Sequence, residues 1–442
     1  MTRNTHNLLV EVEKNIKNAR KTLNMMTAEE QFLLIKDRSH SITQPEELLE
    51  RLVKSKKTHT PLKVKYGIDP TSTDVHLGHM VPLVIGRRFI AMGHEFFVVV
   101  GDFTAMVGDP TGIVETRPLL SNSEITRNQK VIMDRLKRYL KSGLSPKKNC
   151  EEPGGTLRIT NNSKFYTNMS IKDLFEIYRL NKAAPLMQRE GFRNRIEGLT
   201  IAELLYATLM AIDSINIRPD IELGGKDQFL NFQIAREFMK NSGLQAECAI
   251  TTDLLQGTSG DGEKMSKSKD NYISLLESKD EIYGKVMSIP DTLIEHYFKL
   301  LTDISNSDYN KISEAMKKDN LNPMHVKQLL ARVILVDLGF EPSQVELTEK
   351  SFEEVFSKGK VPSNIPEVTL PNIESKHPWI SLLTIIGAAN SNSQARTFIT
   401  DGSVKTLCDN GSWKKVEEIN ESLPDHEFTL KVGKRMFFKI KK

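Results

Sequence analysis

Residues 62–101 contain three segments whose order restricts the fold more than any other part of the chain. Leu62–Tyr66 alternates like a short strand, and the apolar spacing of Met80–Phe89 has the period of a helix. Glu95–Gly101 is then a nearly continuous apolar run, which is typical of a strand buried in a parallel sheet. A strand, a helix and a strand within about 40 residues form a βαβ unit, so we expect an α/β fold with a parallel sheet.

Two histidines flank a glycine where the first strand gives way to the helix. Residues 76–79 read His-Leu-Gly-His and follow a turn at Asp69-Pro70-Thr71. A helix N-terminus offers free N–H groups and about half a positive charge, and Gly78 lets a ligand approach the backbone. A structural histidine pair is the simpler interpretation of so short a motif. Because a strand precedes it, a helix follows it and a second motif lies downstream, we interpret it as a nucleotide polyphosphate site.

The loop after the second strand also carries polar residues. Asp109 lies in a Gly-Asp-Pro-Thr-Gly turn, and Arg117 follows shortly after. Ligands of parallel sheets bind beyond the carboxyl ends of the strands, which is where Asp109 is expected. In isolation an ordinary turn aspartate is the better interpretation of Asp109, and Arg117 could contact phosphate or could simply be solvated.

Residues 202–214 have the composition of a buried helix. Tyr206, Met210 and Asp213 share one face by their spacing. A buried aspartate needs a partner, since burial without one costs several kcal/mol. Asp213 therefore either pairs inside the protein or binds a donor on a substrate.

A second strand-to-turn segment follows at residues 221–228, which read Ile-Glu-Leu-Gly-Gly-Lys-Asp-Gln. The paired glycines at 224 and 225 allow close approach of a ligand, and Asp227 can accept hydrogen bonds from ribose hydroxyls. Helix capping by Asp227 is the alternative that spacing alone favours.

A lysine-rich loop spans residues 257–269. Three glycines lead into it, and Lys264, Lys267 and Lys269 follow. A mobile lysine suits a charge that must be neutralised only in the transition state, because such differential binding raises the rate. A solvated charged loop is the ordinary alternative. The interleaved serines and the upstream His-Leu-Gly-His favour a function at a triphosphate as pyrophosphate leaves.

Composition sets the broad class. The formal net charge of the 442 residues is +4, which by itself does not imply a nucleic-acid partner. Cys150, Cys248 and Cys408 lie far apart, which argues against a disulfide framework or a cysteine metal site. No apolar run approaches the ~20 residues of a membrane helix, and the N-terminus has no signal-peptide core. We expect a cytoplasmic protein with no bound structural metal.

Four regions are predicted along the chain. Residues 1–60 form a helical segment, and 61–280 form the α/β domain with a helical insertion at about 121–205. Residues 281–365 are helical and charged, and a proline-rich linker follows. Residues 379–442 form a last module, in which Arg396 lies on a helix and Lys431, Lys434 and Arg435 lie near a terminal strand. Such a basic face would bind phosphates in a salt-sensitive way.

Taken together, these motifs resemble a known family. Residues 76–79 and 264–268 (Lys-Met-Ser-Lys-Ser) are similar to the HIGH and KMSKS motifs of class I aminoacyl-tRNA synthetases. The segments 108–112, 204–206, 213–214 and 222–228 narrow the resemblance to tyrosyl-tRNA synthetases of the bacterial branch. The match covers residues 40–300 in order, and the last module resembles an S4-like RNA-binding domain.

The resemblance implies a Rossmann-like catalytic domain, a helical domain for the anticodon arm, an S4-like α+β module and a homodimer. It implies that tyrosine is activated with ATP and Mg²⁺ and is then transferred to tRNA(Tyr). Catalysis would involve His76, His79, Lys264 and Lys267. ATP would be bound by these four residues together with Thr71, Gly78, Arg117, Gly224 and Asp227. The amino acid would be bound by Asp69, Asp109, Tyr206, Met210, Asp213 and Gln228.

Two positions depart from the family pattern on the helix that lines the amino-acid pocket. Met210 stands where the family usually has glutamine, and Ile212 stands where it usually has tyrosine. The first change removes a hydrogen-bonding side chain. Three hypotheses follow: a tyrosine–tRNA ligase, a diverged paralogue that adenylates another amino acid or a tyrosine analogue, and an RNA-binding protein that has lost catalysis. The last module departs too, with Thr397 where a second arginine is common.

Overall fold

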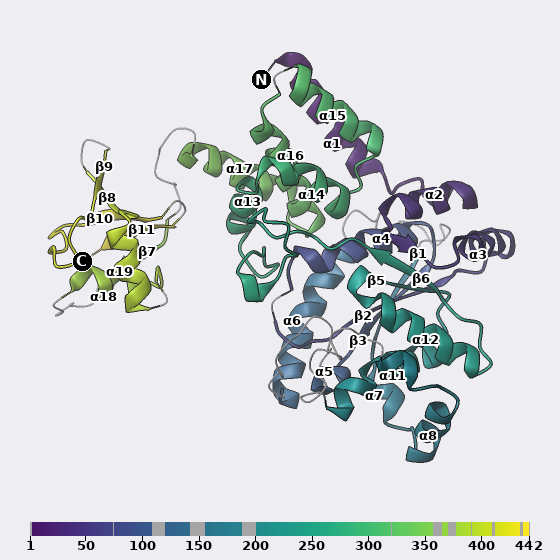
Figure 1. Cartoon of the computed structure of the whole chain (residues 1–442). Coiled ribbons are helices and arrows are strands. Elements are labelled where there is room, and N and C mark those ends of the chain that lie inside the picture. The colour runs from purple at the N-terminus through teal and green to yellow at the C-terminus, as the bar shows by residue number, and fades with distance from the viewer. Residues whose placement is uncertain are drawn as a thin grey trace. The chain divides into compact units, whose positions relative to one another are not determined.

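The computed structural model describes residues 2–73, 75–107, 120–141, 155–187, 200–319, 321–356, 365–369, 377–389, 391–408, 412–433 and 436–441. The predicted site residues Asp109, Arg117, Lys434 and Arg435 lie outside these ranges. The chain divides into two units, Met1–Val345 and Glu346–Lys442 (Figure 1).

The first unit is built on a six-stranded sheet with the order β1-β6-β5-β2-β3-β4. Neighbouring strands are parallel, except that β1 runs antiparallel to β6. Val64, Phe96 and Ile250 in the central strands are fully buried, as expected for a sheet covered on both faces. The predicted parallel sheet is confirmed. The strands are β1 (Ser41–Ile42), β2 (Lys63–Ile68), β3 (Glu95–Val100), β4 (Thr156–Asn161), β5 (Ile221–Gly225) and β6 (Cys248–Thr252).

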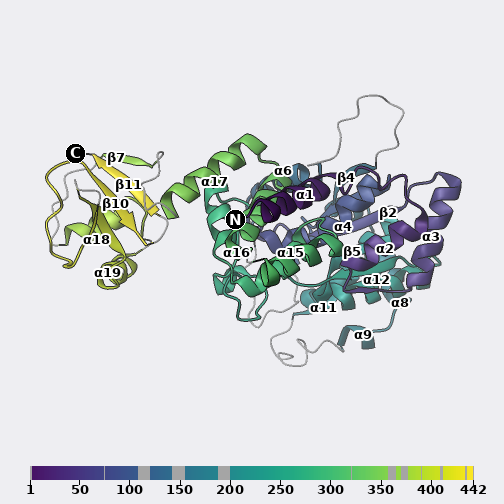
Figure 2. The same ribbon diagram turned by 90° about the horizontal axis from the view of Figure 1, so that it is seen from above.

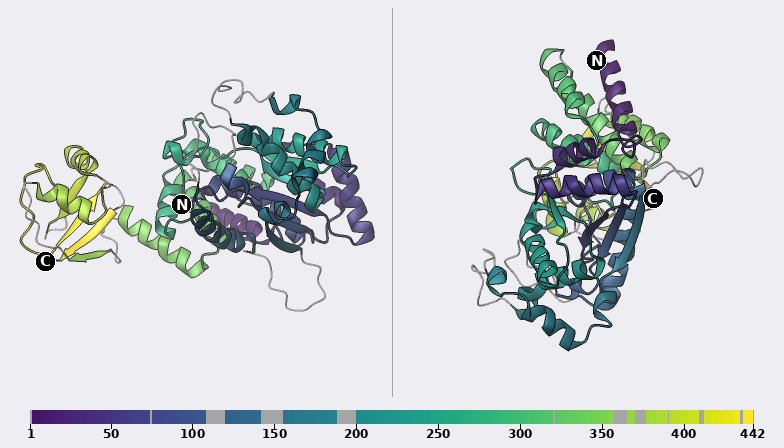
Figure 3. Two further views of the ribbon diagram at one scale, coloured as in Figure 1. Left: turned by 90° about the horizontal axis from the view of Figure 1, so that it is seen from below. Right: turned by 90° about the vertical axis from the view of Figure 1, so that its right-hand side faces the viewer.

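The order of the strands reverses between β2 and β5. The chain crosses from β2 to β3 through α4 (Met80–Ala91), and from β5 to β6 in the opposite direction through α12 (Phe229–Asn241). Because such crossovers are right-handed, opposite directions put α4 and α12 on opposite faces of the sheet. Figure 3 shows the central strands with helices on both sides. The gap between the ends of β2 and β5 is the point at which α/β proteins of this type bind ligands.

Further helices surround the sheet. α11 (Ile201–Ile217) packs along α12, as Figures 1 and 2 show, and it begins with a capping box between Thr200 and Glu203. Within the predicted helical insertion, two helices are present, α6 (Asn122–Lys141) and α8 (Ile171–Arg179). The other helices of this part are α2 (Ala28–Arg38), α3 (Pro45–Thr58), α5 (Thr104–Val107), α7 (Ser163–Tyr166) and α9 (Ala184–Met187).

One part of the predicted helical insertion is a strand. Residues 156–161 form β4, which pairs in parallel with β3 along its whole length and closes that edge of the sheet. Leu157 and Ile159 alternate with polar neighbours, which is the period of a strand with one buried face. The prediction of a mainly helical stretch from 121 to 205 was wrong here, because six residues of alternation are a weak signal between long helices.

The remainder of the first unit is helical. α1 (Arg3–Asn18) packs against two helices that follow the lysine loop, α15 (Asn306–Lys318) and α16 (Pro323–Asp337). Buried ion pairs tie α4 to this part: Arg87 lies 2.6 Å from Asp337 at the end of α16, and Arg88 lies 2.8 Å from Asp303 in the loop before α15. Arg20 contacts both aspartates. The other helices of this part are α13 (Lys279–Met287), α14 (Ile294–Leu301) and α17 (Pro342–Phe356), which runs on into the second unit.

The second unit is a small α+β module, as predicted. Its sheet has the order β7-β11-β10-β8-β9, and only β7 and β11 are parallel. One face packs under α18 (Pro378–Ile385) and α19 (Asn392–Thr400), with Leu383, Ala395 and Leu430 in the core. The strands are β7 (Glu367–Thr369), β8 (Val404–Leu407), β9 (Trp413–Lys415), β10 (Phe428–Val432) and β11 (Met436–Lys441).

Candidate active site

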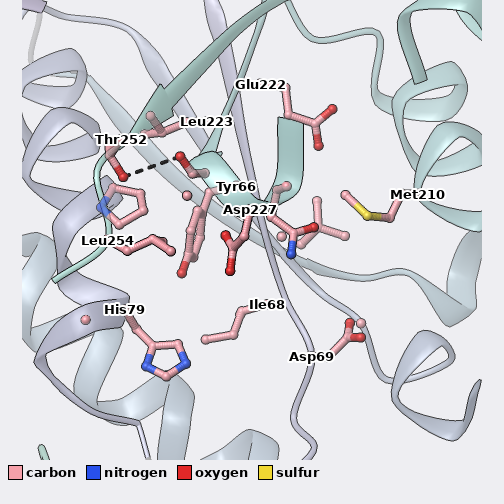
Figure 4. Close-up of a pocket in the computed structure, with 18 of the residues that line it drawn as sticks. Tyr66, Ile68, Asp69, His79, Met210, Glu222, Leu223, Asp227, Thr252 and Leu254 are labelled. Carbon is pink, nitrogen blue, oxygen red and sulfur yellow. Dashed lines mark hydrogen bonds between the residues drawn. The ribbon is translucent and has the colours of Figure 1, made fainter. Parts of the chain in front are cut away.

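A cavity of about 400 Å³ opens at the carboxyl ends of β2 and β5, where the strand order reverses. Figure 4 shows His79 and Leu254 on one side of it, Met210 and Asp69 on the other, and Tyr66 and Asp227 between them. Every predicted catalytic, ATP-binding or amino-acid-binding residue that the structure describes lines this cavity: Asp69, Thr71, His76, Gly78, His79, Tyr206, Met210, Asp213, Gly224, Asp227, Gln228, Lys264 and Lys267.

The two histidines form a compact turn at one end of the cavity. His76 caps the short helix Leu77–His79, and its Nδ1 accepts a hydrogen bond from the Gly78 N–H at 3.2 Å. The His76 and His79 rings lie 4.1 Å apart. A Cβ on residue 78 would lie 2.9 Å from the His76 ring, so glycine is required by close approach.

Burial keeps both histidines neutral. It lowers the pKa of His76 to about 2, with further lowering by His79 and Lys264, and it also lowers the pKa of His79. Since Nδ1 of His76 accepts a hydrogen bond, its ring proton lies on Nε2. His76 can therefore donate one hydrogen bond to an anionic oxygen without carrying a charge of its own.

The lysine loop reaches the same end of the cavity. Lys264 Nζ lies 3.4 Å from Asp227 Oδ2, and both groups are partly exposed. The side chain of Asn271 fixes the loop backbone, because it accepts from the Ser266 N–H at 2.8 Å and donates to the Lys264 carbonyl at 3.3 Å. Met265 is buried beneath the loop. The loop thus presents Lys264 and Lys267 toward the cavity.

At the opposite end, Asp69 is held from two sides. Tyr206 Oη donates to one carboxylate oxygen at 2.8 Å, and Thr104 Oγ1 donates to the other at 2.7 Å. Asp69 directly follows β2 and Tyr206 lies on α11, so the contact joins the end of the strand to the helix. The carboxylate is placed to accept from an ammonium group in the cavity.

Asp213 has partners inside the protein and also lines the cavity. Tyr166 Oη lies 3.0 Å from its Oδ1, and Asn162 Nδ2 lies 3.3 Å from its Oδ2. Burial raises the pKa of Asp213 to about 7, although Lys65, Asn162 and Tyr166 oppose the rise. Each carboxylate oxygen can accept more than one hydrogen bond, so Asp213 can still receive a donor from the cavity.

A buried ionic cluster behind Asp213 was not predicted. Lys65 Nζ lies 2.8 Å from Glu222 Oε1, 2.5 Å from Ser214 Oγ and 3.4 Å from the Met210 carbonyl oxygen. Lys65, Glu222 and Glu247 are all at most 1% exposed. The sequence feature that could have indicated this cluster is Lys65, a lysine within an apolar strand. Glu222 lies directly opposite it on the neighbouring strand.

Three more cavity residues were also missed. Asn162 and Thr104 hold the two aspartates, and Tyr66 projects beside Asp227 (Figure 4). Burial, and then Asp227, raise the pKa of the Tyr66 phenol, so this hydroxyl stays protonated.

The two positions that depart from the family pattern lie in different places. Met210 lines the cavity, and its sulfur-bearing side chain faces it in Figure 4. Ile212 is fully buried elsewhere on α11 and is absent from the lining. Only Met210 therefore bears directly on what the cavity can hold.

Two of the predicted RNA-binding residues, Arg396 and Lys431, lie in the described part of the second unit. Arg396 lies exposed on α19, which covers the core face of the second sheet. Lys431 alternates with the core residues Leu430 and Val432, so it points to the opposite face. Arg396 and Lys431 therefore lie on opposite sides of the second sheet, because the register of β10 turns Lys431 away from the helices.

Comparisons with known proteins agree with this geometry. Residues 56–356 match the family described as tRNA synthetases class I (W and Y). The tyrosine–tRNA ligase of Symbiobacterium thermophilum is 36% identical over 384 residues, which cover 86% of this chain and 91% of that protein. The tyrosine–tRNA ligase of Thermotoga maritima is 35% identical over 419 residues, or 94% and 98% of the two chains.

Solved structures share the fold. A C-terminally truncated mitochondrial tyrosyl-tRNA synthetase of Coccidioides posadasii superposes with a TM-score of 0.59 at 22% identity, covering 79% of this chain and 97% of that one. The tyrosyl-tRNA synthetase of Archaeoglobus fulgidus complexed with L-tyrosine gives 0.55 at 19% identity, covering 73% and 99%. No described helix is long and apolar enough to cross a bilayer. The chain therefore belongs to the class I tRNA synthetases of the tryptophan and tyrosine group.

Proposed function

We propose that the chain is a tyrosine–tRNA ligase, which activates tyrosine with ATP and transfers it to tRNA(Tyr). One observation carries the proposal. A single cavity is lined at one end by neutral histidines and lysines and at the other by two anchored aspartates. The first end suits a polyphosphate, and the second suits the ammonium and phenol groups of tyrosine.

In the first step the tyrosine carboxylate attacks the α-phosphorus of ATP, and pyrophosphate leaves. Neutral His76 and His79 donate hydrogen bonds to phosphate oxygens as charge develops on them. Lys264 and Lys267 neutralise the departing pyrophosphate, which is a contribution made mainly in the transition state. Thr71, Gly78, Gly224 and Asp227 hold the nucleotide, and Arg117 adds a phosphate contact.

Specificity comes from the other end of the cavity. Asp69, Asp109, Tyr206 and Gln228 surround the substrate ammonium, and Asp213 accepts the phenol hydroxyl. A buried acceptor left without its hydrogen bond is costly, so a site of this kind can reject phenylalanine by roughly 10⁴–10⁵. Tyr166 and Asn162 hold the Asp213 carboxylate in place for that contact.

ATP enters as its magnesium complex. Among the described residues, no group of three or more His, Cys, Asp or Glu side chains lies close enough together to hold a metal ion. The ion would therefore be coordinated chiefly by the phosphates, as is usual for magnesium nucleotides. We propose that the second unit, which carries Arg396 and Lys431, contacts the tRNA and takes no part in activation.

A homodimer is part of the proposal. On α8, Ile171 is 78% exposed and Phe175 is 65% exposed, and one turn separates them. Ile201 at the start of α11 is exposed to a similar extent. Apolar side chains gathered in this way are typical of a protein interface, and a second copy of the chain would cover them.

Met210 supports a second candidate, in which the same chemistry acts on another amino acid or on a tyrosine analogue. The thioether offers no strong hydrogen-bond acceptor near the substrate and presents an apolar surface instead. The reaction at the nucleotide end would be unchanged.

Amino-acid-dependent exchange of pyrophosphate into ATP, run with each of the twenty amino acids, tests both candidates. A signal with tyrosine alone supports the ligase, and a signal with a different amino acid supports the second candidate. No signal with any amino acid would contradict adenylation and favour an RNA-binding protein without catalysis.

The same assay tests the role of the lysine loop. Lys267→Ala should slow the exchange on the order of 10²-fold or more, as loss of a transition-state donor does. Lys269→Ala is the matched control, because Lys269 pairs with Glu263 at 2.8 Å and does not line the cavity. Equal rates for Lys267→Ala and the unmodified chain would refute the assigned role.

A further inference from the structure

The face of the second sheet that points away from α18 and α19 carries a row of cations. Phe437 on β11, Lys431 on β10, Lys405 on β8 and Lys415 on β9 are direct cross-strand neighbours, one after another. Directly paired residues point to the same face of a sheet. The opposite face is the one that packs under α18 and α19, so this row lies on the side away from the helices.

The three lysines of the row lack acidic partners within the described part of the chain. Lys414 and Lys439, by contrast, pair with Glu421 at 3.5 Å and Glu367 at 3.3 Å. Burial, and then the charge of Lys405, lower the pKa of Lys431. Like charges directly opposite one another destabilise a sheet. An anion placed over the row would relieve that repulsion.

Aromatic rings complete the face. Lys431 Nζ lies 5.5 Å from the centre of the Trp413 ring and 5.1 Å from that of Phe437. The two rings meet edge to face at 5.8 Å. Phe437 is buried, whereas Trp413 is partly exposed at the edge strand. The ring contacts hold the Lys431 ammonium in one place.

We propose that this lysine–tryptophan face, made of Lys405, Lys415, Lys431, Trp413 and Phe437, binds unpaired nucleotides of the tRNA. The lysines contact successive phosphates, and a base stacks on Trp413. Cations beside an aromatic ring on an open sheet are the combination that single-stranded nucleic acid requires. The identity of the RNA as tRNA rests on the proposed function, whereas the binding of single-stranded RNA does not.

The chemistry of the face favours RNA over a membrane. An anionic membrane surface would be met by lysines together with exposed apolar side chains. In the described part of the second unit, the large apolar side chains that are strongly exposed are Leu347 on α17 and Ile385 on α18, and neither belongs to the strands that form this face. The proposal also differs from binding through Arg396, which lies on the far side of the sheet.

The test measures the affinity of the full chain for a fluorescently labelled tRNA transcript with a tyrosine anticodon, over a series of salt concentrations. Lys405→Gln/Lys431→Gln should weaken binding by about tenfold and lower the slope of log affinity against log salt by about 1.4, since each single-strand phosphate contact contributes about 0.7. Trp413→Leu should weaken binding about fivefold or more with little change in slope, because stacking does not release counterions.

Lys414→Gln is the matched control, because Lys414 is paired on the same sheet and points to the other face. Its affinity for the tRNA transcript should be within about twofold of that of the unmodified chain. Circular dichroism should show that every variant keeps the folded state. The proposal is overturned if the double variant binds normally, if Lys414→Gln weakens binding as much, or if Trp413→Leu has no effect.

Pyrophosphate exchange by the unmodified chain separates this inference from the proposed function. If the unmodified chain exchanges pyrophosphate but substitutions in the lysine–tryptophan face leave the tRNA affinity unchanged, only the inference is refuted. A chain that shows no exchange but loses RNA affinity in these variants refutes the proposed function and leaves the inference standing.

Discussion

Replacing Lys65 by methionine removes the positive charge from a fully buried cluster while keeping most of the side-chain volume. Burial and the neighbouring Glu222 raise the pKa of Glu247 well above its usual value. The Lys65 ammonium pairs with the Glu222 carboxylate at 2.8 Å. Without Lys65 the Glu222 carboxylate is left buried and uncompensated.

Breaking a buried ion pair in this way costs about 3–5 kcal/mol. For the first unit, Met1–Val345, that cost lowers the melting temperature by roughly 4–7 °C, given the usual unfolding entropy per residue. Lys65→Met/Glu222→Gln removes both charges and should recover most of the loss. The measurement is thermal unfolding of both variants and the unmodified chain, followed by circular dichroism.

The pH dependence distinguishes this explanation from a simple packing defect. Burial and Glu222 raise the pKa of Glu247, and Lys65 opposes that rise, so Lys65→Met raises this pKa further. The stability that such a carboxyl contributes is greatest below its unfolded pKa and is lost as pH rises through its folded pKa. The gap between the single and double variants should widen from about pH 4.5 to 8. A gap that does not change with pH, or a loss below about 1 kcal/mol, would refute the reasoning.

The same variant has a functional consequence. Lys65 holds the Met210 carbonyl and Ser214 on α11, the helix that also carries Asp213. The KM for tyrosine in pyrophosphate exchange should therefore rise more than the KM for ATP.

Two other predictions follow from contacts described above. Tyr166→Phe removes a hydrogen bond to Asp213 and so raises the pKa of Asp213 further above about 7. In the unmodified chain kcat/KM for tyrosine should rise with pH through that region. In the variant the rise should move to higher pH. An unmoved profile, measured by pyrophosphate exchange, would contradict the assignment of Asp213. Phe175→Glu should disrupt the dimer, as seen by light scattering, because it places a charge on the apolar face of α8. Lys172→Glu on the same helix is its control, and a dimer in both variants would place the interface elsewhere.

The parts of the site that lie at strand ends could be predicted from the sequence. The turn at His76–His79, the glycine turn after β5 and the lysine loop each have distinctive local residues, and the strand-end rule brings the first two together. The structure places all of them around one cavity. Local turn chemistry is visible in a sequence because it depends on residues a few positions apart.

The partners of those residues could not be predicted in the same way. Tyr166 reaches Asp213 from 47 positions away, and Glu247 joins Lys65 from the residue just before β6. Neither contact has a local pattern, since each depends on how distant segments pack. Lys431 illustrates a further limit: its charge was evident, but the face it occupies depends on the register of β10.

The buried pairs of Arg87 with Asp337 and of Arg88 with Asp303 make α4 a strut between two parts of the first unit. Its arginines are about two turns from His79, so the helix spans roughly 12 Å between the ion pairs and the histidine turn. Displacing α16 would leave buried charges in the core without their partners. The unfolding of the helices is therefore coupled to that of the sheet. A macromolecule that binds at α14–α16 and displaces these helices would therefore displace α4 as one rigid element, and the histidine turn would move with it.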